Sequence, residues 1–450
     1  MDKTNEIQRG KSSTGKMIAF GSPRFGSSVV LGIEGWALLT LYFVAYGLDP
    51  FRATFAQAMG YLAIAAAQFL LGWISDGKYT RWGRRKPYII IFAPLLGISF
   101  IFLLLPGLVL PDLNDKNSLF LWLLVWDVLF RISYAVTTPY QAWMAEQFEV
   151  GDRPKVSQIQ NYCNWIGNGL MSILTMLVFT GVFDKIAVDV NTIPMEFLLI
   201  TVVFGVMVIL LFYIVAFFMP TEPKYEIKTN LIENLKVIVK NKNYMLVVLM
   251  QGIAGLGLSM MTSVMLTYTE VVLNLGFMEY LIVAILLLVG IFLFLFIWRT
   301  LIQKKGKKST ILYIFLFGFI SLPITLTGLI PMDISLIIGI IFILIVAFVL
   351  GGWFLFPYIM YADLAEDDER STGDLKAGIY VGFPSIILNI FQAFGLLILG
   401  VILSLPNITV DGVTFTIGLV LWGPLCSVIF IITYLYIRKF VILDFDWEKK

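Results

Sequence analysis

DGKYTRWGRRKP, residues 76–87, is the most hydrophilic stretch in the first third of a chain that is otherwise strongly apolar. Of the 450 residues, 59% are hydrophobic and only 14% are charged, a composition too apolar for a protein surrounded by water. Apolar runs of about twenty residues, the length at which a helix crosses a bilayer, recur along the whole chain. The sequence therefore predicts an integral membrane protein in which residues 76–87 form a loop between two spans.

A sliding window of about 19 residues divides the chain into apolar spans and loops. Twelve spans result, at 26–46, 52–75, 87–107, 118–140, 157–181, 195–219, 244–270, 278–299, 310–330, 334–358, 377–404 and 415–437. With both termini on one side, only Arg52, Lys116 and Lys185 of the 32 lysines and arginines fall in loops on the other side. Because short cationic loops stay in the cytosol, we expect a multi-pass protein of the plasma membrane with both termini cytosolic.

The chain has no histidine and two cysteines, Cys163 and Cys426, both inside apolar spans. The sequence therefore predicts neither a disulfide framework nor a zinc site, and we expect no cofactor. Residues 1–24 lack the apolar stretch of a signal peptide, so they are predicted to be a short basic tail in the cytosol.

Two pairs of loops indicate an internal repeat. The loop at 299–310, RTLIQKKGKKST, joins spans eight and nine as residues 76–87 join spans two and three, and both carry a glycine beside paired cations. Spans four and ten each end in an alanine and an acid, Glu146 and Asp363. We therefore expect an all-α membrane protein with two six-helix bundles, at 1–219 and 245–450, joined by a cytosolic linker at 220–244.

The loop motifs also resemble those of a known family. Gly72, Asp76, Gly83, Arg84 and Arg85 in GWISDGKYTRWGRRKP match the cytosolic loop signature of the major facilitator superfamily. The extended motif, with YADLAEDDERSTGD and TTPYQAWMAE, is similar to the glycoside-pentoside-hexuronide:cation symporters, to which melibiose permease belongs. The resemblance implies twelve helices around a central cavity and a secondary transporter that moves a sugar or glycoside by alternating access.

The same motif residues are candidates for a cytosolic gate. Gly72 allows close helix approach, and Asp76 at a helix end accepts hydrogen bonds from a neighbouring helix or from the arginines. We expect a latch that closes the cytosolic side and breaks when the cavity opens inward. It comprises Gly72, Asp76, Gly83, Arg84, Arg85, Glu146 and Asp363. The alternative is that the cations only fix the topology and contact anionic lipid headgroups.

Three charged residues lie within predicted spans, where a charge is costly and normally faces a partner or water. Glu34 lies in span one, and Asp127 and Arg131 share one face of span four because they are four residues apart. In the superfamily both spans line the cavity, so we expect Glu34 and Arg131 to meet across it and to couple a cation to transport. Tyr134 and Thr138 extend the same stripe. A static structural ion pair is the alternative.

Amides and aromatic residues within the spans are candidates for substrate binding. Asn161, Asn164 and Asn168 form a polar stripe on span five. The other predicted lining residues are Trp36, Gln68, Tyr134, Thr138, Gln251, Trp353, Tyr380, Asn389 and Gln392. Amides and hydroxyls bind sugar hydroxyl groups, while flat rings stack on the apolar face of a sugar. For any single amide the alternative is a hydrogen bond that only joins helices.

The sequence departs from the sodium-coupled melibiose permeases in span two. The two aspartates of those proteins correspond to Ile64 and Gln68, which argues against sodium coupling and galactoside specificity. Without histidine, proton coupling needs a buried carboxylate, and Glu34 is the first candidate with Asp127 next.

Three functions are alternatives to a coupled sugar carrier. An uncoupled facilitator and a carrier of a lysolipid or other amphiphile stay open. An enzyme that holds magnesium-diphosphate would need two acidic motifs, and only DLAEDD, with Asp363 and Asp367, is present. We therefore expect a monomeric transporter of a small molecule, with no enzyme activity and no nucleic-acid partner.

Overall fold

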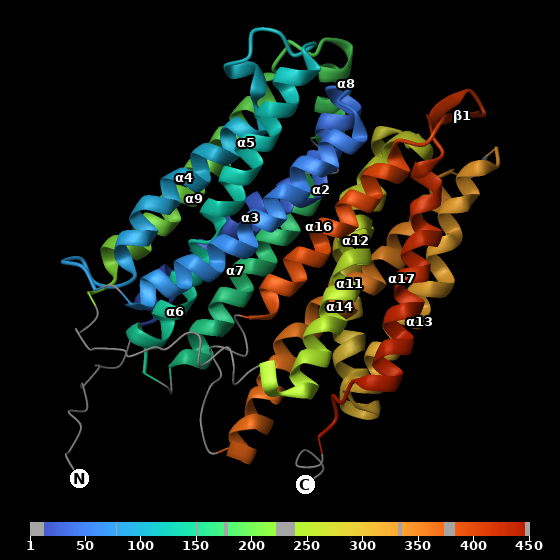
Figure 1. Cartoon of the computed structure of the whole chain (residues 1–450). Helices are drawn as coiled ribbons and strands as arrows, with labels where there is room; N and C mark the ends of the chain where they lie inside the picture. The colour runs from blue at the N-terminus through green and yellow to red at the C-terminus, as the bar shows by residue number, and fades with distance from the viewer. Residues whose placement is uncertain are drawn as a thin grey trace, which may run out of the picture.

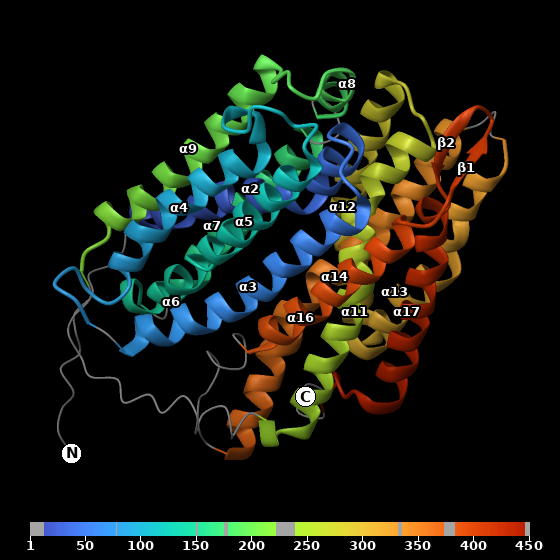
Figure 2. The same cartoon turned by 45° about the horizontal axis from the view of Figure 1, so that its top comes forward.

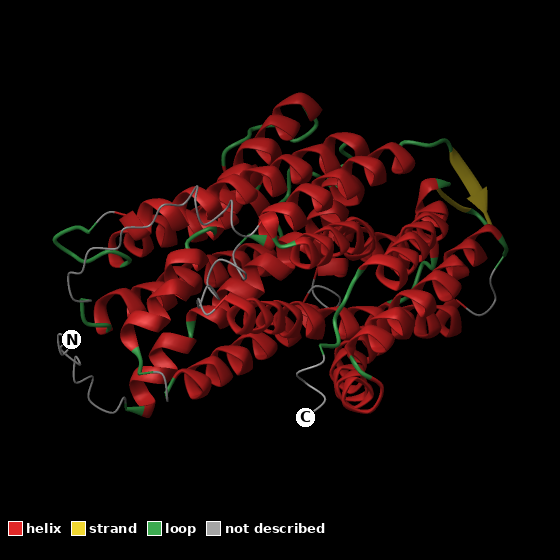
Figure 3. Ribbon diagram, turned by 60° about the horizontal axis from the view of Figure 1, so that its bottom comes forward, coloured by secondary structure: helices red, strands yellow, loops and turns green. Residues whose placement is uncertain are grey.

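The computed structural model of the chain describes residues 13–77, 79–149, 152–174, 179–221, 239–331, 335–372 and 383–445. Almost all of these residues are helical, and the described strands form one hairpin at the edge of the molecule (Figure 3). The helices of the first half are α1 (Thr14–Gly21), α2 (Pro23–Thr40), η1 (Leu41–Ala45), α3 (Pro50–Gly77), α4 (Lys86–Leu104), η2 (Pro106–Leu108), α5 (Lys116–Tyr134), α6 (Thr137–Gln147), α7 (Arg153–Leu174), α8 (Thr180–Val188) and α9 (Met195–Phe218).

The second half follows residues 222–238, which lie outside the described ranges. Its elements are α11 (Lys242–Thr267), η4 (Tyr268–Val272), α12 (Phe277–Lys305), α13 (Lys307–Ser321), η5 (Leu322–Leu329), α14 (Ser335–Thr372), α16 (Pro384–Leu403), β1 (Asn407–Val410), β2 (Val413–Thr416) and α17 (Gly418–Phe440). The long helices lean together in two groups (Figure 1).

Eleven helices in the described ranges are long and apolar enough to cross a membrane. The predicted span that is missing from this set is 157–181, which corresponds to α7 (Arg153–Leu174). The stripe of three asparagines on this helix lowers its mean hydropathy, and residues 175–178 lie outside the described ranges. A helix of this length that is too polar for lipid is expected to face protein or water.

Helix contacts divide the chain into two halves. Within the first half, α2 packs on α7 and α9, and α5 packs on α3 and α4; within the second, α11 packs on α16 and α17, and α12 packs on α14. Among the described elements, the main packing between the halves joins α3 with α16, α2 with α11, and α7 with α12. Figure 2 shows α3 beside α16 along this boundary.

The two ends of the molecule differ. We call the end where α1 begins and α17 ends the terminal end, and the opposite end, which carries β1 and β2, the hairpin end (Figure 1). The strands pair antiparallel from Asn407↔Thr416 to Val410↔Val413. Asp411 and Gly412 connect them with φ of 50° and 78°. Positive φ at both central residues is typical of a type I′ turn, for which Asp-Gly is a favoured sequence. Neither strand is predicted from the sequence.

The halves contact each other through matching segments near the hairpin end. The side-chain oxygens of Thr40 and Thr267 are 2.9 Å apart, and both residues are completely buried. A π-helical turn follows each threonine, η1 in the first half and η4 in the second. Tyr42 in η1 donates a hydrogen bond to the carbonyl of Leu103, and Tyr268 in η4 donates to the carbonyl of Thr325. The same local structure therefore occurs twice, as the predicted repeat requires.

Replacing Thr40 and Thr267 with cysteine is expected to give a disulfide that holds the hairpin end closed. Because their side-chain oxygens are 2.9 Å apart, cysteines at these positions would bring two sulfur atoms close together. In a chain with Cys163 and Cys426 changed to serine and a protease site inserted within 222–238, oxidation should keep the cleaved halves joined on a non-reducing gel. In a carrier that works by alternating access, as the resemblance implies, this contact must open, so uptake should fall on oxidation and return on reduction. Each single cysteine variant is the control, and full uptake by the cross-linked protein would contradict the idea that this contact must open.

Two predicted spans agree with the structure, but the helices that form them have other ends. Span four lies within the apolar segment Lys116–Met144, where α5 ends at Tyr134 and α6 begins at Thr137. Pro139 lacks the N–H that would continue the hydrogen bonds of α5. Span ten corresponds to the apolar segment Ser335–Tyr361, and α14 continues beyond it to Thr372 with the i,i+4 ion pair of Glu366 and Arg370.

The predicted basic tail is also shorter than expected. Ser13 caps α1 by accepting a hydrogen bond from the backbone N–H of Lys16, and the Lys16 ammonium donates to the carbonyl of Gln147 at 3.1 Å. Residues 14–24 are therefore helical and fixed to the first half, while residues 1–12 lie outside the described ranges.

Candidate functional site

A buried ion pair joins α2 to α5. Arg131 donates from Nη2 to both carboxylate oxygens of Glu34, at 2.6 and 2.7 Å, and from Nε at 3.2 Å. Glu34 is completely buried and Arg131 is 3% exposed. A guanidinium that meets a carboxylate with several hydrogen bonds offsets much of the cost of removing both charges from water. The predicted meeting of Glu34 and Arg131 is therefore observed.

The place where they meet differs from the prediction. Both residues belong to the first half of the chain, so the pair lies between α2 and α5 within that half and does not bridge a cavity between the halves. The next position on α2, Gly35, has open space beside it, because a Cβ added there would meet no atom within 4 Å.

A second carboxylate lies beside the ion pair. Asp127 is completely buried, one helical turn before Arg131, and it interacts electrostatically with both Glu34 and Arg131. Neither oxygen of its side chain accepts a hydrogen bond from a donor group, and the carboxyl group within hydrogen-bonding reach is that of Glu34. Two carboxylates and one guanidinium are therefore enclosed together, and their formal charges do not balance.

Two residues of α3 complete this cluster, and neither is among the site residues predicted from the sequence. The Arg131 guanidinium carbon lies 3.8 Å from the centre of the Tyr61 ring, a cation–π contact. A Cβ at Gly60 would fall on Oδ2 of Asp127 and lie 3.0 Å from Cγ of Arg131. Gly60 thus gives the two side chains their space. The sequence does contain an indication that span two contributes to the cluster, because Gln57, Tyr61 and Gln68 are polar or amphipathic residues at helical spacing in this span.

The asparagine stripe of α7 faces two helices. Ser28 of α2 donates a hydrogen bond to Asn164, so this amide joins helices within the first half. Trp165 contacts Phe292 of α12 with ring centres 5.0 Å apart. Asn161 and Asn168, which lie four before and three after Trp165, are exposed. The exposed amides are therefore on the side of α7 that faces the second half.

The predicted lining residues of the second half are more buried than expected. Tyr361 of α14 donates a hydrogen bond to the Gln251 side chain, which is 5% exposed. Trp353 and Asn389 are both 8% exposed, and Trp353 packs against Phe315 of α13. Gln392 is partly exposed on α16. Tyr380 lies outside the described residues.

Four further predicted lining residues come from the first half. Trp36 and Gln68 are partly exposed, although Oε1 of Gln68 is buried without a hydrogen-bond partner. Tyr134 is 9% exposed, and Thr138 packs toward Gly72. Because the chain turns between α5 and α6, Tyr134 and Thr138 do not extend the Asp127–Arg131 stripe on one continuous helix.

The motif loop at the terminal end encloses a second buried ion pair. Arg85 donates to Oε1 of Glu146 from Nε at 3.2 Å and from Nη2 at 3.1 Å, and from Nη1 to Ser75 at 2.8 Å. Arg84 is 2% exposed. Gly83, with a φ of 99°, pairs with Thr80 and turns the chain into α4. Both arginines are therefore within the protein and not at the lipid headgroups in this state.

The second half repeats this arrangement. The Lys307 ammonium lies 2.6 Å from Oδ2 of Asp363, and Gly306 before it has a φ of 83°.

In the first half, Gly72 of the motif lies against Thr138. A Cβ added at Gly72 would be 3.3 Å from the methyl group of Thr138. The Asp76 side chain lies outside the described residues. The two ion pairs described here, Arg85 with Glu146 and Lys307 with Asp363, each join elements of one half.

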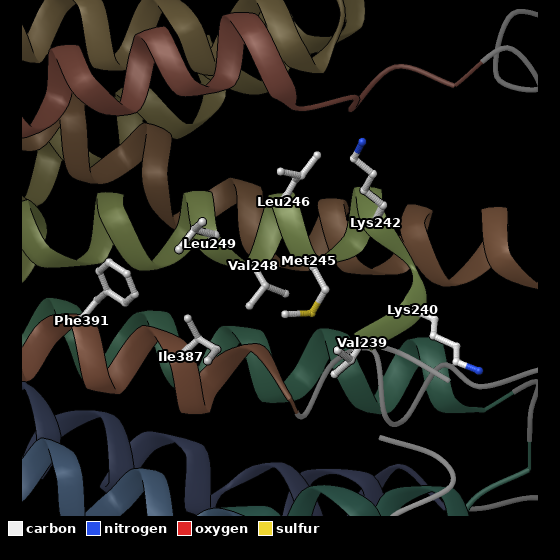
Figure 4. Close-up of a pocket in the computed structure, with 9 residues that line it drawn as sticks. All are labelled: Val239, Lys240, Lys242, Met245, Leu246, Val248, Leu249, Ile387 and Phe391. Carbon is white, nitrogen blue, oxygen red and sulfur yellow. The ribbon is translucent and has the colours of Figure 1, made fainter. Parts of the chain in front are cut away.

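A cavity of about 430 Å³ lies at the terminal end between α11 and α16 (Figure 4). Val239, Met245, Leu246, Val248, Leu249, Ile387 and Phe391 line it, with Lys240 and Lys242 at its margin. Its walls are therefore apolar, with two cations near the start of α11. Within the described ranges, no three Asp, Glu, His or Cys side chains come together as metal ligands do.

Comparison with known proteins identifies the family. A family model described as MFS/sugar transport protein matches residues 19–435. The chain belongs to this family. No curated protein sequence matches the chain. The family and its fold are those of transporters, so this is a multi-pass membrane transporter with the major facilitator fold.

Solved structures agree with this fold. The D-xylose-proton symporter has a TM-score of 0.63 at 15% identity, covering 95% of this chain and 97% of that one. The nucleoside transporter NupG has a TM-score of 0.61 at 14% identity, covering 94% and 98%. A bacterial homolog of the human lysosomal transporter Spinster, inward-facing and occupied, has a TM-score of 0.63 at 13% identity, covering 94% and 95%. Their cargoes differ, so the likeness concerns the fold of this transporter.

Proposed function

We propose that this transporter moves a sugar or glycoside across the plasma membrane by alternating access, driven by a proton gradient. The observation that carries the sugar proposal is the exposed amide face of α7, where Asn161 and Asn168 flank Trp165 on the side toward the second half. Exposed amides are costly in lipid and suit a water-filled path. An aromatic ring between two amides matches a ligand with hydroxyl groups and an apolar face.

The coupling proposal rests on the buried cluster on α2, α3 and α5. Glu34 of α2 is paired with Arg131 of α5, so a change of charge in the cluster can change how these two helices are held together. Binding of a proton and of a sugar are coupled if each favours the same conformation. Uncoupled facilitation is the competing case, in which the cluster only holds the helices together.

The orientation is part of the proposal. The terminal end carries the cationic loops at 76–87 and 299–310, which is the pattern of a cytosolic face. The contact of Thr40 with Thr267 lies near the other end. We therefore assign the terminal end to the cytosol and the described state to one that is closed on the outer side.

An amphiphile is the second candidate cargo because of the cavity in Figure 4. Its apolar walls fit a hydrocarbon chain, and Lys240 and Lys242 at its margin fit an anionic headgroup. In this case the polar face of α7 would serve only to carry water or a headgroup.

Uptake by purified protein in liposomes separates these functions. We expect uptake of at least one labelled sugar or glycoside, and we expect no transfer from a matched panel of lysolipids. An inward proton gradient should raise sugar accumulation, and a protonophore should remove that increase. Glu34→Gln should lose accumulation because it breaks the pair with Arg131. Sugar uptake that ignores both the protonophore and this substitution would leave facilitated diffusion, and transfer of lysolipid alone would favour the amphiphile.

A further inference from the structure

The charges of the buried cluster do not cancel. Arg131 directs Nε and Nη2 to Glu34, and these two groups form a neutral pair. Asp127 then adds a second carboxyl group in a site where all three side chains are at most 3% exposed. If all three were ionised, the cluster would carry one uncompensated negative charge inside the membrane. A buried unpaired charge is unstable, and the usual response is that the group becomes neutral.

The surroundings of Asp127 offer it no hydrogen-bond donor. Its titratable and charged neighbours are Glu34 from α2, Tyr42 from η1, Tyr61 from α3, and Arg131 on its own helix. Tyr42 donates its hydroxyl to the carbonyl of Leu103 and so is already engaged. Both oxygens of Asp127 are left without a donor, which is costly for a carboxylate, whereas a neutral acid can itself donate to the neighbouring Glu34 carboxylate.

A metal cation fits this position poorly. Hard cations bind several oxygen ligands at once. Gly60 packs so closely that a Cβ there would fall on Oδ2 of Asp127. Within the described ranges, no third acidic, histidine or cysteine side chain joins Glu34 and Asp127 to form a ligand set. A proton needs neither space nor further ligands.

We propose that Asp127 holds the coupling proton, while Glu34 stays ionised as the partner of Arg131. Asp127 binds the proton as its carboxylate becomes a carboxylic acid, and it releases the proton to water when its site opens. The ionised Asp127 then competes with Glu34 for Arg131 on the shared face of α5, which would change how α2 and α5 are held. This assignment differs from the expectation from the sequence, in which Glu34 is the first candidate to bind the proton and Asp127 is the second. The role of this proton in coupling rests on the proposed function, whereas the presence of a proton on Asp127 does not.

Infrared spectroscopy of the substrate-free protein at neutral pH tests the bound proton directly. A carboxylic acid has a carbonyl band that carboxylates lack, and the band shifts in heavy water. We expect the wild-type protein to show this band. Asp127→Asn and Glu34→Gln should each lose it, because either change leaves one carboxyl group, which Arg131 then holds ionised. Glu270 is a second acid with a buried, unpaired oxygen, so Glu270→Gln is the matched control for any band that remains in Asp127→Asn. Glu34→Asp keeps both acids and should leave the position of the band unchanged; a band that moves in Glu34→Asp and not in Asp127→Glu would overturn the proposal.

A second variant covers the case in which Asp127→Asn does not fold. Asp127→Glu keeps an acid at this position and should move the position of the band, whereas an unmoved band overturns the proposal. The two proposals can also fail separately. In liposomes, Asp127→Asn should exchange sugar but lose its accumulation under a proton gradient. If no sugar is carried at all while the band follows Asp127, the sugar function fails and the proton site stands.

Discussion

Arg131→Met is expected to lower the free energy of unfolding by about 3–5 kcal/mol and to abolish uptake. The substitution keeps much of the apolar stem but removes all three hydrogen bonds to Glu34, which is completely buried. It also removes the cation above the Tyr61 ring. Glu34 would then be an unpaired charge beside a second carboxyl group. Denaturant unfolding in detergent, followed by circular dichroism, measures the loss.

The matched control is the double variant Glu34→Gln with Arg131→Met. Removing both members of a buried ion pair leaves no uncompensated charge, and such replacements are often close to neutral. We expect the double variant to regain most of the lost stability while uptake stays absent. If the single variant were as stable as the wild-type protein, water would have to reach Glu34, and the site would not be closed as described.

The ion pair could be predicted because a charge inside an apolar span has few acceptable surroundings. Glu34, Asp127 and Arg131 were identified on this basis, and the structure places all three in one cluster. Tyr61 and Gly60 were missed because an aromatic residue or a glycine in a membrane span is ordinary. Their roles depend on which residue of α5 lies opposite them, and that register comes from the packing of α3 on α5.

The lining residues show the limit of the same reasoning. The pattern that put Asn161, Asn164 and Asn168 on one stripe is present on α7, yet Asn164 bonds to Ser28 while the other two are exposed. Gln251 likewise bonds to a tyrosine of its own half. A sequence shows that an amide lies in a span, but whether it joins helices or faces a path depends on a neighbour far along the chain.

The spans and the repeat are predicted from length, hydropathy and loop charge, and eleven of the twelve predicted spans correspond to helices in the described ranges that are long and apolar enough to cross a membrane. The matching glycines at 83 and 306 both have positive φ in the structure, as a shared loop design requires. The ends of α5 and α14 were not predictable by hydropathy, because Pro139 interrupts one apolar run and α14 continues as an exposed polar helix beyond the other. Apolar length therefore predicts the membrane segment and not the helix.

Glu146→Ala is expected to destabilise the protein by about 3–5 kcal/mol, more than the matched change Asp363→Ala in the second half. The two acids occupy the same place in the repeat but differ in burial. The side chains of Arg85 and Glu146 are 5% and 7% exposed, whereas those of Lys307 and Asp363 are 9% and 20% exposed. Arg85 would keep its bond to Ser75 and lose two bonds to a carboxylate in a closed site.

Loss of its partner is less costly for Lys307 than for Arg85. Its flexible ammonium can turn toward water past the more exposed Asp363 position, so its charge is less costly to leave unpaired. The same unfolding measurement on Glu146→Gln and Asp363→Asn, which keep a polar group, should give the same order with smaller losses. Equal losses in the two halves would mean that burial does not set the strength of these ion pairs. Uptake adds a second reading, because a latch that must break predicts altered transport from both substitutions, whereas a purely structural pair predicts a loss only in proportion to the fraction unfolded.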